Sequence, residues 1–322
     1  MNYYYYKDYF VSLFLWKMYG LQTALSILSE IRSWNIKSLN DIKVYDTLTP
    51  AFLVTLASFV NQGLISKGEI KTLPEVYTYL SRCNFNHIIW ISWVTSNYTW
   101  NSENLVEITA ITQKEQTFWW NIDEICAKLF VKSKNLKKDD EDSIRFLNNL
   151  DNTLLLALTE IMDNIWVHSE ANLSQKACLY MLQHYPSKNR THLAVIDNWI
   201  WIIKSMKNSW YFENDKKDEY YLNLAMQRKI TSWKGAWNWL FLVSEIVKET
   251  DSKLEICTWN ILFKQNWQNK EIKYNSFEFP WTLININFNM ELIDNKEREW
   301  LSSINKLNGE ITDYAFYDNI FE

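Results

Sequence analysis

Residues 193–202 read LAVIDNWIWI, and this stretch decides how the C-terminal half of the chain is interpreted. An apolar run ends at Asp197, and tryptophan then alternates with isoleucine. Such a run predicts a buried strand, and a carboxylate at its end can accept a hydrogen bond from an amino group. Trp199 and Trp201 follow directly, where a turn needs small residues with a free φ angle.

Tryptophan is abundant in this chain and glycine is scarce. The sequence contains 18 tryptophans and 5 glycines, whereas average usage predicts roughly 22 glycines in a chain of this length. Many tryptophans lie in turn-like contexts, where a bulky indole at positive φ is strained. We hypothesise that many of them are encoded by UGA, which the source organism reads as glycine. The alternative is a tryptophan-rich protein with unusual turns, and UGG codons at these positions would establish it.

Three further motifs accompany residues 193–202. Residues 158–168 read LTEIMDNIWVH, and Glu160, Asn164 and His168 share one helix face because they are spaced four residues apart. Residues 235–240 read GAWNWL and precede an apolar helix predicted from Phe241 to Val247. With glycine at 237 and 239, this loop would present backbone N–H groups to phosphates. Residues 279–282 read FPWT and lead into a strand predicted at 283–288.

In this order and spacing, the four motifs resemble the N, G1, G2 and Gly-Thr boxes of the gyrase, histidine-kinase and MutL (GHKL) ATPases. The anti-sigma-factor serine kinases are the most similar members, because a histidine follows the asparagine of the first motif by four residues. The resemblance covers about residues 145–290. It implies an α/β class, here an α+β two-layer sandwich of the Bergerat type with a mixed sheet, and it implies ATP and Mg²⁺ as ligands.

The resemblance also implies a role for each matching residue. Asn164 would coordinate Mg²⁺, Glu160 would be the catalytic acid or base, and residues 203–234 would form a mobile lid over ATP. Asp197 would recognise adenine, and Thr282 would support that contact. The other ATP-binding positions would be His168, Trp199, Trp201, Gly235, Trp237, Asn238, Trp239 and Leu240. As written, the indoles at 199, 201, 237, 239 and 281 would fill the nucleotide pocket.

The N-terminal half predicts a smaller α/β layer domain. Residues 1–36 have a helical apolar period, Pro50 and Pro74 open helices that run through Val60 and Cys83, and strands are expected at 42–45, 68–73, 88–91 and 105–111. The order of elements resembles a STAS-type domain, although many α/β modules share this outline. We therefore expect a helical segment at 1–36, a STAS-like domain at 37–131, a charged linker at 132–143, an ATPase domain at 144–290 and a helical tail at 291–322.

Composition narrows the partners and the compartment. The net charge of −5 argues against a nucleic-acid partner. No segment approaches the roughly 18 apolar residues of a membrane-spanning helix, and the four cysteines form no Cys-x-x-Cys pair, which favours a reducing, cytoplasmic location.

The sequence therefore predicts a cytoplasmic, Mg-ATP-binding regulatory protein that acts on a protein partner. It would either phosphorylate a serine of that partner or change its affinity as the lid opens and closes. The alternative is a protein-interaction module with a degenerate nucleotide site and no catalysis. A sensor histidine kinase is disfavoured because no transmembrane or phosphoacceptor segment is found, and homodimerisation stays open.

Overall fold

The computed structural model describes residues 21–44, 48–90, 105–112, 161, 176–197, 202–207, 216–227 and 239–290. The predicted linker at 132–143 and the predicted tail at 291–322 lie outside these residues. Of the long helix expected from Ile144 to His168, only Ile161 is described; it is helical and buried.

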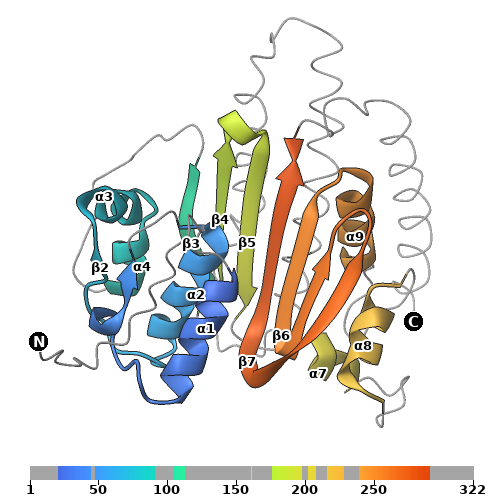
Figure 1. The fold of residues 1–322 in the computed structure, drawn as a ribbon, viewed down its shortest axis with the longest axis horizontal. Helices are drawn as coiled ribbons and strands as arrows, with labels where there is room; N and C mark the ends of the chain where they lie inside the picture. Colours follow the sequence, from blue (N-terminus) through green and yellow to red (C-terminus); the bar gives the residue numbers. More distant parts are fainter. Residues whose placement is uncertain are drawn as a thin grey trace, which may run out of the picture.

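A five-stranded sheet forms the centre of the described chain (Figure 1). Its order is β3-β4-β5-β7-β6, and each neighbouring pair is antiparallel. The strands are β3 (Leu105–Thr112), β4 (Lys176–Tyr185), β5 (Arg190–Asp197), β6 (Lys253–Gln265) and β7 (Lys270–Asn289). A single 3₁₀ turn, η2 (Pro186–Lys188), joins β4 to β5. Because side chains alternate between the faces of a strand, this sheet presents two faces that both need cover.

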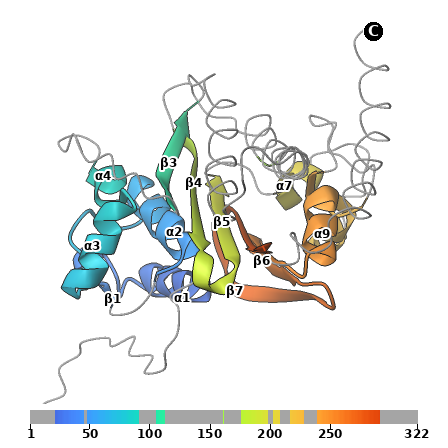
Figure 2. The same cartoon turned by 90° about the horizontal axis from the view of Figure 1, so that it is seen from above.

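One face of the sheet is covered by α1 (Leu21–Arg32) and α2 (Pro50–Asn61), as both views show (Figures 1 and 2). Every residue of α2 from Pro50 to Val60 is buried, which is the pattern of a helix enclosed on all sides. Pro50 occupies the first turn, and the Thr49 hydroxyl accepts a hydrogen bond from the Phe52 amide at 3.4 Å. The helix predicted from Pro50 through Val60 is therefore confirmed.

The opposite face carries α7 (Ile202–Lys207), α8 (Asp218–Ala225) and α9 (Trp239–Glu249). Along β5, Leu193 and Val195 belong to the core on this side, whereas Ala194 and Ile196 belong to the core under α2. The sheet is therefore the middle layer between two sets of helices (Figure 2).

The remaining N-terminal elements lie beside α2. They are the 3₁₀ turn η1 (Leu39–Asp41), the short strands β1 (Lys43–Val44) and β2 (Lys71–Thr72), and the helices α3 (Pro74–Arg82) and α4 (Phe85–Trp90). β1 and β2 pair in parallel, with α2 between them in the chain. The strand predicted at 88–91 is wrong, because Ile88 and Ile89 are buried residues of α4. A short apolar run cannot distinguish a strand from one turn of buried helix.

The described chain has the α+β class, with antiparallel pairing in the large sheet and parallel pairing in the small one. β3 lies within the predicted N-terminal domain at 37–131 but pairs with β4 of the large sheet. The cores also join, since α2 packs against β4, β5 and β7. Among the described helices, none combines the length and the apolar character that crossing a membrane requires.

Candidate functional site

The structure brings two of the predicted site residues together across neighbouring strands. Asp197 ends β5, and Thr282 lies directly opposite it on β7. The Thr282 amide donates a hydrogen bond to Asp197 Oδ1 at 3.0 Å. Both side chains are buried, with 9% of Asp197 and 2% of Thr282 exposed. This hydrogen bond fixes the carboxylate at the end of its strand. A carboxylate can accept several hydrogen bonds at once.

Two residues that the sequence motifs missed extend this pair into a row across four strands. Cys178 on β4 lies opposite Asp197, and Thr258 on β6 lies opposite Thr282. The hydroxyl oxygens of Thr258 and Thr282 are 3.3 Å apart. We call Cys178, Asp197, Thr282 and Thr258 the polar row. No sequence signal could have found Cys178 or Thr258, because their place depends on strand register.

The polar row lies in an apolar setting on the side of the sheet that carries α9. Cys178 belongs to the core formed with α9, together with Val195 and Ile284. Burial and the negative charge of Asp197 both raise the pKa of the Cys178 thiol, so the thiol stays neutral. The thiol therefore adds no second charge next to Asp197 in the row.

A β-bulge interrupts β6 immediately after the polar row. The regular pairing shifts between Thr258 and Trp259 and again before Ile261. Trp259 has a φ of 53°, the left-handed conformation that glycine adopts in one type of bulge. Bulges of this kind frequently lie beside functional sites, where they redirect a strand.

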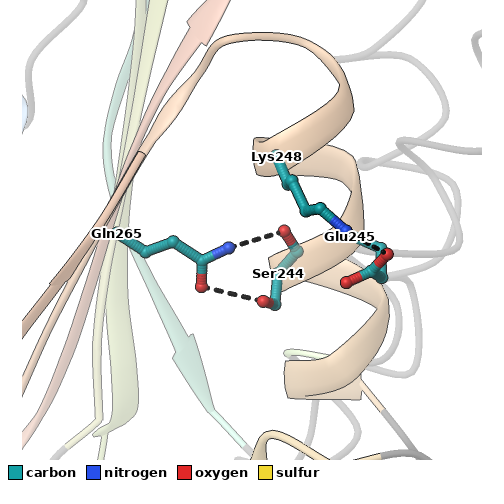
Figure 3. Close-up of polar contacts among 4 residues, drawn as sticks. All are labelled: Ser244, Glu245, Lys248 and Gln265. Atoms are coloured by element: carbon teal, nitrogen blue, oxygen red, sulfur yellow. Dashed lines mark hydrogen bonds and ion pairs between the residues drawn. The ribbon is translucent and has the colours of Figure 1, made fainter. Parts of the chain in front are cut away.

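Helix α9 begins at Trp239, where the predicted phosphate loop ends. Leu240 is buried in the core beneath this helix. Two hydrogen bonds hold α9 to β6 (Figure 3): Ser244 Oγ donates to Gln265 Oε1 at 2.8 Å, and Gln265 Nε2 donates to the Ser244 carbonyl at 2.9 Å. Figure 3 also shows the partly exposed ion pair between Lys248 and Glu245 on the same helix. The buried contact fixes the position of α9 relative to the sheet.

Trp281 does not lie in the predicted nucleotide pocket, which corrects the expectation that its indole would fill that pocket. It precedes Thr282 on β7, so its side chain points to the opposite face, under α2. The indole is 4% exposed and stacks on Phe59 of α2 with ring centroids 5.6 Å apart. Trp281 is therefore a packed core residue behind the polar row.

The segment predicted to be a lid, residues 203–234, includes two helices that pack on the core. Ile203 and Met206 of α7 are buried, as are Tyr221 and Leu222 of α8. Lys207 joins the two helices by an ion pair with Asp218. Residues 208–215 and 228–234 lie outside the described residues. A lid that moves freely therefore cannot include α7 and α8 without opening the core.

Trp34 adopts a conformation typical of glycine. It has a φ of 62° and follows the last turn of α1. The Trp34 N–H donates a hydrogen bond to the Ile31 carbonyl, and the Asn35 N–H donates one to the Glu30 carbonyl. These two hydrogen bonds form the Schellman pattern. The end of α2 repeats this pattern with Gly63, whose φ is 72°. Trp34 thus occupies the position that a glycine occupies at the end of the next helix.

A polar cavity of about 800 Å³ lies on the other face of the sheet from the polar row. His192, Glu255 and Asn285 line part of it. Glu255 is engaged there, since Lys264 and Asn285 each contact its carboxylate at 2.8 Å. Burial first, and then the charges of Lys188 and Arg190, lower the pKa of His192 to about 4. Antiparallel sheets commonly keep one face partly solvated, and this cavity has that character.

The other predicted site residues lie outside the described part of the chain. They are Glu160, Asn164, His168, Trp199, Trp201, Gly235, Trp237 and Asn238. Trp239 is described only as the first residue of α9. Within the described ranges, no group of three His, Cys, Asp or Glu side chains could hold a metal ion. No protein-family model matches the chain, and no curated protein is significantly similar to it.

Proposed function

We propose that this chain, with glycine at positions 199, 201, 237 and 239, is a cytoplasmic Mg-ATP-binding regulatory protein. Its ATPase domain would occupy residues 144–290 with a Bergerat-type fold, and a STAS-like domain would occupy 37–131. The observation that carries the proposal is the buried contact between Asp197 and Thr282. The ordered motifs assigned these two residues to one adenine contact although 85 positions separate them in the chain.

The chemistry of this pair suits an adenine ring. The amino group of adenine donates hydrogen bonds, and the adjacent ring nitrogen accepts one. A buried carboxylate and a neighbouring hydroxyl match these two groups. A charged group held in an apolar wall is characteristic of a ligand site.

The position of α9 supports the assignment of the phosphate site. A glycine-rich loop that leads into a helix presents amide donors and the positive end of the helix dipole to phosphates. Residues 235–238 precede α9 directly, and the Ser244–Gln265 contact holds that helix on the sheet. Asn164 would hold Mg²⁺ through its amide oxygen, and Glu160 would orient the attacking water or hydroxyl.

The N-terminal half supports a regulatory role through its contact with the same sheet. The parallel β1–β2 pair with α2 between its strands is consistent with an α/β module. α2 packs behind the strands that carry Asp197 and Thr282. A protein partner bound by this half would therefore act on the sheet that holds the nucleotide.

The test is ligand-dependent stabilisation of the variant that has glycine at 199, 201, 237 and 239. A ligand at 100 times its Kd stabilises the folded state by about 2.7 kcal/mol. We expect Mg-ATP to raise the melting temperature of this variant. Adding Asp197→Ala should abolish the rise, whereas the control Asp251→Ala, in the turn before β6, should keep it.

Two outcomes of this test separate the functions. If millimolar Mg-ATP leaves the melting temperature of the glycine variant unchanged, the protein does not bind ATP and the interaction-module alternative stands. If Mg-ATP binds, Glu160→Ala should keep binding but lose phosphate release or transfer, and unchanged turnover would remove Glu160 from catalysis.

A further inference from the structure

The polar cavity of about 800 Å³ lies on the opposite face of the sheet from the polar row. Small-molecule sites have volumes of this order, about 300–1,000 Å³. One wall of the cavity is a row across β5, β7 and β6, formed by His192, Asn287 and Lys253. The turn between β6 and β7 adds Asn266 and Asn269. Most of the wall therefore belongs to strands whose register the sheet already fixes.

The charges around the cavity do not balance. Two glutamates line it, and both are paired. The Glu255 carboxylate contacts Lys264 at 2.8 Å, and the Glu271 carboxylate contacts a lysine outside the cavity at 3.0 Å. Lys253 and Lys270 also line the cavity, and neither ammonium group has an ion pair or hydrogen bond with the described residues. The charge left uncompensated at the cavity is therefore positive.

The imidazole of His192 lies in the same positive field. Burial lowers its pKa most, and the charges of Lys188 and Arg190 lower it further, against the opposing charge of Glu255, to about 4. The ring is therefore neutral at pH 7 and offers one hydrogen-bond donor and one acceptor. Thr49, the N-cap of α2, also lines the cavity, so the positive end of that helix dipole adds to the field. These charges all favour an anionic ligand.

The uncharged part of the lining suits hydroxyl groups. A carboxamide both donates and accepts hydrogen bonds, and so does a hydroxyl group. Among the described residues that line the cavity, none is a phenylalanine, tyrosine or tryptophan, so a nucleobase would lack the aromatic platform on which bases stack. The carboxamides that suit hydroxyl groups are those of Asn266, Asn269, Asn285 and Asn287.

We propose that this cavity binds a small phosphorylated sugar, with its phosphate at Lys253 and Lys270 and its hydroxyl groups at the asparagines. A phosphate group carries between one and two negative charges at neutral pH and presents several acceptor oxygens. Lysine binds phosphate as a point charge, and two unpaired lysines meet that need. The proposal is independent of the proposed nucleotide site, because the cavity and the polar row lie on opposite faces of the sheet.

The experiment measures affinities by calorimetry on the full chain, with its tryptophans in place. The probes are glucose 6-phosphate, ribose 5-phosphate and glycerol 3-phosphate, and the reference compounds are inorganic phosphate and glucose. We expect at least one phosphorylated probe to bind more tightly than both reference compounds. Added salt should weaken this binding, because the lysines are exposed to solvent and their charges are screened.

The variants Lys253→Gln and Lys270→Gln remove one charge each and leave the strands unchanged. Each should weaken binding by about three- to tenfold, the factor that one net hydrogen bond supplies. The matched control is Lys67→Gln, which removes the same charge from an exposed position outside the cavity. It should leave the affinity unchanged. An equal loss in this control would show attraction to the overall charge of the chain and would overturn the site.

His192 provides a second readout that a purely structural role of the lysines would not move. A bound phosphate opposes the positive charges that lower the pKa of its imidazole. The His192 ring resonances should therefore titrate at higher pH with the phosphorylated sugar than without it, and glucose should not change them. An unchanged titration would place the bound anion outside the cavity and overturn the proposal.

Two further results would contradict the proposal. If no phosphorylated probe binds at millimolar concentration, the cavity is not a site for this class of ligand. If inorganic phosphate binds as tightly as all three probes, the asparagines make no contact with a sugar and that assignment fails. None of these measurements involves ATP, so their failure leaves the proposed nucleotide site standing.

Discussion

Replacing Trp34 by glycine is expected to stabilise the protein, even though tryptophan has the largest of the amino-acid side chains. The indole is 79% exposed, so its removal loses little buried surface. The backbone at this position has a φ of 62°, and its hydrogen bonds match those at Gly63. The substitution therefore acts on the backbone conformation that ends α1.

The magnitude follows from two opposing effects. A non-glycine residue in the left-handed conformation costs about 1–2 kcal/mol. Glycine loses more backbone freedom on folding, which costs about 0.5–1 kcal/mol. Trp34→Gly should therefore raise the free energy of unfolding by about 0.5–1 kcal/mol, or the melting temperature by about 1–4 °C.

The assay is denaturant unfolding, in which the midpoint should rise with an unchanged slope. Trp267→Gly is the matched control, because Trp267 is 54% exposed and has no positive φ. It should be neutral or destabilise by up to about 1 kcal/mol. The complementary change, Gly63→Ala, should destabilise by conformation alone, since a Cβ at Gly63 would meet nothing within 4 Å. Equal effects of Trp34→Gly and Trp267→Gly would refute the reasoning.

Three further outcomes are expected. Trp259→Gly should relieve the left-handed strain of the bulge, so it should be tolerated better than a glycine elsewhere in β6. Unfolding midpoints measure this difference. A fall in the free energy of unfolding of more than about 2 kcal/mol would contradict the expectation. Trp281→Gly should destabilise by about 3–5 kcal/mol, because it leaves a cavity against Phe59, and a neutral result would show that the indole is not packed there. The pKa of His192 is about 4 in the folded protein and 6.5 in the unfolded chain. As pH falls, the unfolded state therefore takes up the proton first, and stability is lost below about pH 6.5. Between pH 7 and 5 this loss should be about 2 kcal/mol, and His192→Gln should lack it when unfolding is followed at both pH values.

Local patterns predicted the elements whose ends carry strong signals. The proline at the first turn of α2 and of α3 located both helices, and the apolar run before Asp197 located β5. The strand at Leu283–Phe288 and the helix at Phe241–Val247 also lie within described elements of the same type, β7 and α9. These signals are local in the chain, so they could be read without knowing the tertiary fold.

Pairing between distant strands could not be predicted in the same way. The sequence placed β3 in an N-terminal module, but its partner β4 is about 70 residues further along the chain. The same limitation hid Cys178 and Thr258, which join Asp197 and Thr282 only through register. Alternation puts Trp281 and Thr282 on opposite faces of β7, but only the packed structure decides which of these faces meets α2.

Three tryptophans of the described ranges fall into two physical groups, and the glycine hypothesis applies to the groups differently. Trp34 and Trp259 hold positive φ angles, which an indole adopts only under strain. Trp281 holds none and fills a core site between Phe59 and Phe279. A glycine at 34 or 259 would relieve strain, whereas a glycine at 281 would require another side chain to fill the space behind Thr282. Because Thr282 contacts Asp197 directly, that space lies next to the proposed adenine contact. The residue at 281 therefore links the packing of α2 to the strand that carries Thr282.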